Sequence, residues 1–214
     1  MPKIGVFDSG VGGLSVAHAI QVALPDAEVL FINDHDNVPY GTKSPELLLE
    51  LVQPILNALS DEGCEVIVIA CNTVSTTIIK QLQAVISTPL IPMEPMVKAA
   101  AELTKSGTIA VCATPTTLAS QRYKWLKDNF AAKVQVLEPD CSDWSSMIEN
   151  DKIDRQQITD RIEAVCQRGA DVIVLGCTHY HWIEDLIDRL ADGRAKVLQP
   201  EQLVIDQLRT MLKF

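Results

Sequence analysis

Long basic runs and membrane-length apolar runs are both missing from this sequence. A formal net charge of −10 further disfavours binding to nucleic acid or to an anionic membrane surface. The first residues lead directly into an apolar segment, without the charged region and cleavage site of a secretory signal. These absences predict a cytoplasmic protein that binds neither nucleic acid nor membranes.

The six cysteines include no C-x-x-C pair. In a reducing compartment such cysteines are expected to be free thiols rather than disulfides. Cys177 and His179 could offer two metal ligands, but no nearby residues supply two more, so we expect no metal site.

The glycine-rich turn at residues 8–16, DSGVGGLSV, lacks the complete pattern of either common nucleotide-binding motif. The dinucleotide motif would need glycine at Ser15, and the P-loop would need a Gly-Lys-Ser/Thr ending. Backbone N–H groups at the start of a helix remain, and these suit a carboxylate. Asp8, at the end of the preceding strand, is either a helix cap or a group of the active site.

Two similar segments, VIVIACNT (66–73) and VIVLGCTH (172–179), each place a thiol at the end of an apolar run. Runs without polar positions predict strands buried on both faces, as in a parallel sheet covered by helices. Ligands of such sheets bind beyond the carboxyl ends of the strands. Cys71 and Cys177 are therefore candidate active-site residues.

The similarity extends beyond the two thiols, since residues 3–8 parallel 108–113 and residues 27–32 parallel 132–137. A period this long indicates a duplicated domain rather than a solenoid. We predict an α/β fold of two pseudo-symmetric lobes with mainly parallel sheets, and an active site in the cleft between them. The lobes are expected at 1–96 and 97–200, with a C-terminal helix within 201–214 packing back on the first.

Polar residues surround both expected strand ends. Hydroxyls in residues 72–77 can cap the following helix or hold a carboxylate, and the helix start is expected to lower the pKa of Cys71. In the second lobe, Thr114 and Thr117 stand where the first lobe has its glycine-rich turn. Glu149 ends a loop rich in Asp and Ser, and we expect it on the surface.

Two thiols at one cleft could form a redox pair, act as a nucleophile with a spare, or serve as an acid and a base. In a racemase, a thiolate and a thiol on opposite faces of a carbon remove and return a proton, which inverts the centre. A cysteine hydrolase would need only one thiol with a dedicated histidine, so it leaves the second thiol unexplained.

The segments IGVFDSGVGGLSV, VPYGTKS, IVIACNT and LGCTHY resemble, in order and spacing, the signature segments of the glutamate racemases. This resemblance to the aspartate/glutamate racemase superfamily covers about residues 3–182. It implies interconversion of L- and D-glutamate without pyridoxal phosphate or another cofactor, supplying D-glutamate for peptidoglycan. It also implies a small acidic amino acid as the binding partner, and a homodimer.

The resemblance assigns a role to each matching residue. Cys71 would take the proton of the D-enantiomer and Cys177 that of the L-enantiomer, with Asp8 and His179 assisting and Glu149 aligned with the family's acidic loop residue. The substrate contacts implied by the motifs are Asp8, Ser9, Tyr40, Gly41, Asn72, Thr73, Thr178 and His179, to which the second-lobe turn adds Thr114 and Thr117.

Two segments depart from the family pattern. The loop CSDWSSMIE keeps only Cys141, an aromatic residue and Glu149, and the turn at residues 113–117 reads ATPTT. Two alternatives therefore stay open: a racemase for aspartate or another acidic amino acid, and a catalytically idle relative that binds an amino acid.

Overall fold

The computed structural model describes residues 1–213, which form two compact units. The first unit contains Met1–Glu94 together with the segment from Pro200, and the second contains Pro95–Gln199. The boundaries expected from the sequence, after residues 96 and 200, fall beside these.

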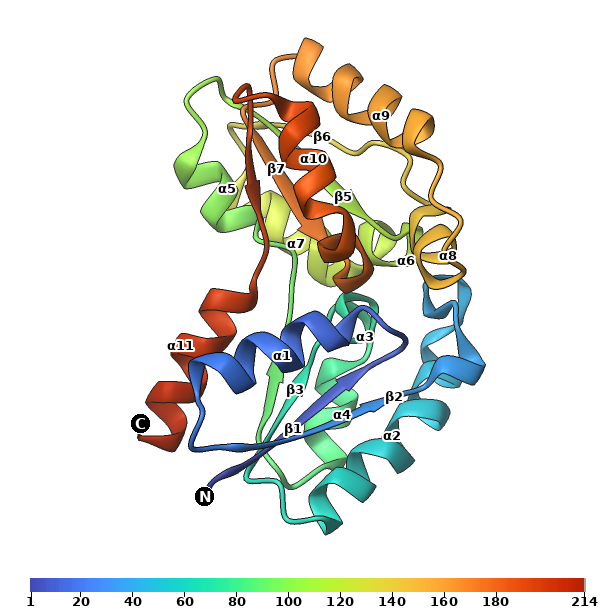
Figure 1. Cartoon of the computed structure of the whole chain (residues 1–214), viewed down its shortest axis with the longest axis vertical. Helices are drawn as coiled ribbons and strands as arrows, with labels where there is room; N and C mark the ends of the chain where they lie inside the picture. The colour runs from blue at the N-terminus through green and yellow to red at the C-terminus, as the bar shows by residue number, and fades with distance from the viewer. Residues whose placement is uncertain (214) are drawn as a thin grey trace. The chain divides into compact units, whose positions relative to one another are not determined.

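The first unit contains four strands: β1 (Lys3–Asp8), β2 (Glu28–Asn33), β3 (Val66–Ile69) and β4 (Leu90–Pro92) (Figure 1). All pairings are parallel, in the order β2-β1-β3-β4. Along β3, Val66 and Val68 contribute to the core on one face of the sheet and Ile67 and Ile69 to the core on the other. The uniformly apolar run is therefore explained by burial on both sides.

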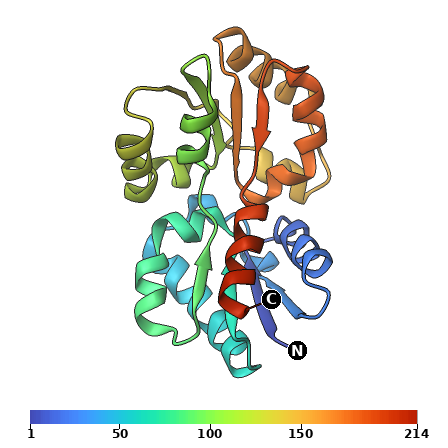
Figure 2. The same cartoon turned by 90° about the vertical axis from the view of Figure 1, so that its left-hand side faces the viewer.

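Helices cover both faces of this sheet. On one face, α1 (Gly13–Ala23) lies beside the C-terminal helix α11 (Glu201–Leu212), as Figure 2 shows. The other face packs against α2 (Pro45–Asp61), α3 (Asn72–Thr77) and α4 (Ile79–Val85). Two short 3₁₀ turns, η1 (His35–Asn37) and η2 (Tyr40–Thr42), connect β2 to α2.

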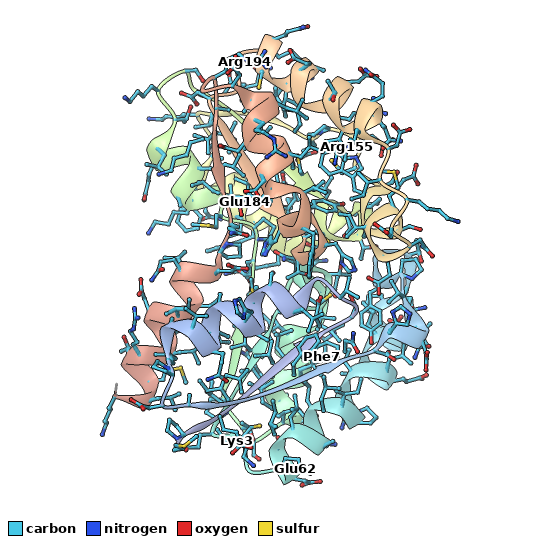
Figure 3. All side chains as sticks on the ribbon, viewed as in Figure 1. Lys3, Phe7, Glu62, Arg155, Glu184 and Arg194 are labelled. Atoms are coloured by element: carbon cyan, nitrogen blue, oxygen red, sulfur yellow. The ribbon has the colours of Figure 1, made fainter. Side chains whose placement is uncertain are left out.

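Local sequence signals set the limits of α2. The Ser44 hydroxyl accepts the Leu47 N–H at 3.3 Å, and proline follows at the first helical position. Apolar residues three and four apart, including Leu48, Val52 and Leu56, face the sheet and are fully buried. At the other end, Lys3 Nζ donates to the Glu62 carbonyl at 2.9 Å, so the end of α2 is tied to the start of β1, where Figure 3 labels both residues.

The second unit repeats the arrangement with β5 (Thr108–Ala113), β6 (Gln135–Leu137), β7 (Val172–Gly176) and β8 (Lys196–Leu198). The strand order β6-β5-β7-β8 matches that of the first unit position for position. Both sheets are parallel throughout. The predicted α/β class with two parallel sheets is confirmed.

The helices of the second unit again form two layers. One face of its sheet is covered by α5 (Val97–Leu103) and α7 (Gln121–Phe130), with α6 (Pro115–Ala119) before α7. The other face is covered by α8 (Trp144–Glu149), α9 (Arg155–Gln167), η3 (Thr178–Ile183) and α10 (Glu184–Ala191).

The helix after the last strand of each sheet belongs to the other unit. Thus α5 follows β4 along the chain but packs in the core of the second unit, while α11 follows β8 and packs in the core of the first. Buried Val97 carries the first of these contacts, and Val204 and Leu208 carry the second. Each sheet is therefore completed by a helix from the opposite half of the sequence.

Candidate active site

Asp8 is the last residue of β1 and is completely buried. Its Oδ2 accepts the N–H of Gly13, the first residue of α1, at 2.7 Å. A Cβ at position 13 would overlap Asp8 Cβ and approach Phe31 Cε2 to 2.8 Å, so only glycine lets the helix start this close to the carboxylate. Asp8 is therefore not the N-cap residue, which is Gly12, but one of its oxygens accepts the first N–H group of α1. It also means that one N–H group at the start of α1 is already used by the protein itself.

Cys71 follows β3 and immediately precedes α3; it is 4% exposed. Its thiol donates to the Ser9 hydroxyl at 3.6 Å, which joins the residues that follow β3 and β1. Because neighbouring parallel strands end at the same edge, residues distant in sequence meet here.

Asn72 and Thr73 begin α3, and both side chains are buried. In the described part of the chain, neither Oδ1 nor Nδ2 of Asn72 has a hydrogen-bond partner. Buried amide groups are normally paired, and leaving one unpaired costs about 1–3 kcal/mol. An amide held in this way next to a thiol fits a group that hydrogen-bonds a ligand.

The other hydroxyls of α3 do not cap the helix. Ser75 Oγ donates to the Ile69 carbonyl at 3.0 Å and accepts the Met93 N–H at 3.1 Å, which links β3 to the residue after β4. Thr76 and Thr77 donate to carbonyls one turn earlier, at 2.8 and 2.6 Å. For Ser75, Thr76 and Thr77, the prediction that the hydroxyls cap the helix or hold a carboxylate is wrong, because each donates to a backbone carbonyl.

Tyr40 lies in η2 and is 2% exposed, with Gly41 next to it. Its hydroxyl donates to Asp34 Oδ2 at 2.6 Å. Burial, followed by this hydrogen bond, raises the pKa of Tyr40 far above its usual value. Tyr40 is therefore a neutral hydrogen-bonding group. Sequence reasoning missed Asp34, although the turn-rich segment NDHDN was the signal for it.

In the second unit, Cys177 follows β7 and lies 3.8 Å from His179 Nδ1. The other ring nitrogen, Nε2, is 2.5 Å from Glu149 Oε2. The side chains of His179 and Glu149 are 3% and 6% exposed. The expectation that Glu149 lies on the surface is wrong, because α8 ends against η3 and directs this carboxylate to the imidazole. A thiol, an imidazole and a carboxylate thus form a continuous line of polar contacts.

The turn after β5 carries hydroxyls where the first unit has glycines. Thr114 caps α6 by accepting the Thr117 N–H at 3.3 Å, and its hydroxyl donates to Thr117 Oγ1 at 3.0 Å. Both residues are buried, and so is Thr178, at the start of η3. Residues Thr114, Thr117 and Thr178 all follow carboxyl ends of neighbouring strands in this sheet.

All six cysteines are buried free thiols. Burial raises the pKa of Cys64 and of Cys166, and it raises that of Cys141 strongly, with a further contribution from a hydrogen bond to Cys112. Cys64, Cys141 and Cys166 pack in the cores of the two units, and the raised pKa values hold these three thiols protonated.

Within residues 1–213, no group of three or more His, Cys, Asp or Glu side chains has the arrangement of a metal site. Among the helices of the same residues, none has both the length and the hydropathy needed to cross a membrane.

This chain is similar to known proteins over most of its length. The family model described as Asp/Glu/Hydantoin racemase matches residues 14–208. Glutamate racemase of Stutzerimonas stutzeri (strain A1501) is 37% identical over 98% of this chain and 81% of its own length. The glutamate racemase of Pseudomonas aeruginosa shows the same identity and coverage.

Solved structures of glutamate racemases have the same fold as this chain. Escherichia coli glutamate racemase, in complex with L-glutamate and an activator, is 26% identical with a TM-score of 0.86, covering 99% of this chain and 82% of that one. The Francisella tularensis glutamate racemase with D-glutamate is 28% identical with a TM-score of 0.83, covering 99% and 81%. With a family match over most of its length and relatives of this identity, the chain belongs to the Asp/Glu/Hydantoin racemase family.

Proposed function

We propose that the protein interconverts L- and D-glutamate without a cofactor, using Cys71 and Cys177 as its two bases. The observation that carries this proposal is the pair of strand-end thiols at equivalent positions of two copies of one sheet. The relatives named glutamate racemase support glutamate as the substrate.

In the proposed reaction, the Cys71 thiolate removes the α-proton of D-glutamate, and the Cys177 thiol delivers a proton to the opposite face of the planar carbanion. The reverse reaction starts with the Cys177 thiolate and L-glutamate. The chemistry requires both sulfur atoms to reach one α-carbon in the working enzyme.

Cys71 and Cys177 have different neighbouring groups to take up the thiol proton. For Cys177, His179 lies within reach to accept the thiol proton, and Glu149 stabilises the resulting imidazolium, as in other cysteine–histidine pairs. For Cys71, the thiol donates to the Ser9 hydroxyl, whose own proton stays available for a substrate carboxylate. Asp8, buried at the end of β1, is the proposed proton acceptor on this side.

A substrate with two carboxylates must be bound by a chain of net charge −10. The motif segments contain no arginine, so we assign the carboxylates to hydroxyl, amide and backbone N–H groups. The buried Asn72 amide, whose two polar atoms lack partners in residues 1–213, supports this assignment. In the first unit, Ser9 and Thr73 supply hydroxyls, and Tyr40 and Gly41 are further proposed contacts. In the second unit, Thr114, Thr117 and Thr178 supply hydroxyls.

The cellular role follows from the product. D-glutamate made by this reaction is proposed to serve peptidoglycan synthesis in the cytoplasm, and the enzyme is proposed to act as a homodimer. Light scattering of the purified protein measures its mass in solution and so tests the dimer.

Circular dichroism of L-glutamate incubated with purified protein and no added cofactor tests the activity. The signal should decay to zero as the equal mixture of enantiomers forms. Incubation with L-aspartate in parallel decides the substrate, since faster decay there would identify an aspartate racemase. A constant signal for every acidic amino acid would refute the enzymatic function and leave an amino-acid-binding relative.

A further inference from the structure

Helix α8 and the residues just before it contact η3 at Tyr180 as well as at His179. Tyr180 is fully buried, and its hydroxyl donates to the Cys141 carbonyl oxygen at 2.8 Å. Its ring meets the edge of Trp144, with centroids 5.2 Å apart and planes at 67°. Two consecutive residues of η3 are therefore attached to one short segment of the chain, residues 141–149.

The Cys141 carbonyl also accepts the backbone N–H of Trp144, at 3.2 Å. Trp144 is the first residue of α8 and Glu149 is the last. A helix of this length extends only about 9 Å, so a shift at its start is carried to Glu149. The same carbonyl oxygen thus holds the start of α8 and the ring of Tyr180 together.

At the end of α8, Glu149 can assist His179 only if the two side chains stay at hydrogen-bond distance. Glu149 Oε2 and His179 Nε2 are 2.5 Å apart, and a carboxylate assists an imidazole only within hydrogen-bond reach. A displacement of about 1 Å in such an arrangement can cost on the order of 100-fold in rate. Whatever fixes α8 against η3 therefore influences the protonation of Cys177 through His179.

The segment 141–149 resembles the glutamate racemases at three residues, Cys141, an aromatic residue and Glu149. All three contact η3: Cys141 through its carbonyl, Trp144 through its ring and Glu149 through its carboxylate. The ring contact with Tyr180 therefore gives the retained aromatic residue a role in joining α8 to η3.

We propose that Tyr180 is a positioning residue for the half-reaction of Cys177, because its contacts with Cys141 and Trp144 hold Glu149 against His179. The proposal rests on the proposed racemase function. It predicts that loss of the Tyr180 hydroxyl impairs proton abstraction by Cys177 and leaves abstraction by Cys71 intact.

The two half-reactions can be measured separately with the enantiomers of 3-chloroglutamate. A base removes the α-proton, chloride leaves from the β-carbon, and the resulting enamine takes up water to give 2-oxoglutarate and ammonium. One base suffices, so each enantiomer reports on one thiol. Racemisation itself cannot make this distinction, because an equilibrium constant of one forces equal kcat/KM in both directions.

Tyr180→Phe keeps the ring and removes only the hydroxyl. We expect elimination from the L-enantiomer to fall about tenfold, elimination from the D-enantiomer to stay unchanged, and racemisation to lose kcat with little change in KM. Tyr123→Phe is the matched control: Tyr123 is also fully buried in the second unit and donates to Glu138 at 2.9 Å, but it packs on the other face of the sheet.

A double variant adds a second measurement. Glu149→Gln should also lower elimination from the L-enantiomer more than elimination from the D-enantiomer. Adding Tyr180→Phe to Glu149→Gln should lower elimination little further, because the Tyr180 hydroxyl acts through Glu149. Equal losses for both enantiomers, no loss relative to Tyr123→Phe, or full additivity with Glu149→Gln would each overturn the proposal. An unmodified protein that neither racemises nor eliminates would instead refute the proposed function.

Discussion

The two units of the molecule share one topology but surround their thiols with different groups. Ile4 pairs with Val66 in the first sheet and Ile109 pairs with Val172 in the second, so even the strand register repeats. Cys71 contacts a serine hydroxyl, whereas Cys177 contacts an imidazole backed by a carboxylate. Buried strands thus preserve the duplication, and the segments after the strands carry the differences in chemistry.

This difference fits a reaction whose two directions start from mirror-image substrates on a site made of L-amino acids. In the proposed mechanism, each thiol acts as base in one direction and as acid in the other. Two unlike environments can still complete one cycle, provided each can both lose and regain a proton. The comparison can be tested at positions that are equivalent in the repeat.

The largest effect is expected from the thiols themselves. Cys71→Ser and Cys177→Ser should each lower racemisation by more than about 1000-fold, because a serine hydroxyl does not ionise near neutral pH. Each variant should still eliminate chloride from the 3-chloroglutamate enantiomer handled by the remaining thiol. Racemisation by either variant at near the parent rate, measured by circular dichroism, would show that the two-base assignment is wrong.

The groups that assist the thiols should rank next. His179→Asn and Asp8→Asn should mainly lower kcat, by about 100-fold or more, because each removes a proton acceptor. Asn at position 8 retains an oxygen that can accept the Gly13 N–H, so the start of α1 is kept. Steady-state kinetics in both directions measures the effect. If KM rises while kcat is unchanged, these residues bind substrate and do not transfer protons.

The hydroxyls proposed to bind carboxylates should affect mainly KM. Ser9→Ala and Thr73→Ala each remove a hydrogen bond to a charged group, worth about 1.5–3 kcal/mol, or roughly 10- to 150-fold in KM. Neutralising Lys43 or Arg122 serves as the comparison. A large rise in KM from those cations, with none from Ser9 or Thr73, would mean that a basic side chain holds the substrate.

The smallest effect is expected where the two units are most alike. Gly63 and Gly169 end α2 and α9 with φ of +83° and +89°, and their N–H groups each donate to a carbonyl at 2.9 Å. No other atom lies within 4 Å of a Cβ built at either residue. Alanine at either position should therefore destabilise the fold by about 1 kcal/mol, from backbone strain alone. Urea unfolding that gives clearly unequal losses would contradict the equivalence of these turns.

Much of the fold could be predicted because it depends on periodic burial. The runs at Val66–Ile69 and Val172–Gly176, and the internal repeat, predict the strands and the two parallel sheets. The side-chain contacts were harder to predict. Glu149 was expected on the surface because its own loop is polar, and only the packing of α8 on η3 brings it to His179. The contacts of Asp34 and Tyr180 are not predicted either, since the pairing of Asp34 with Tyr40 and of Tyr180 with Cys141 depends on how the chain folds.

The central claim is that two thiols act on opposite faces of one carbon. Racemisation of L-glutamate in deuterated water tests this most directly, with the α-position of each enantiomer analysed early in the reaction. A two-base mechanism predicts deuterium in the D-glutamate formed and protium in the L-glutamate not yet converted, because the proton removed by one thiol is replaced by a solvent-derived one from the other. Deuterium appearing equally fast in the unconverted L-glutamate would mean that a single base removes and returns the proton, and would contradict the account.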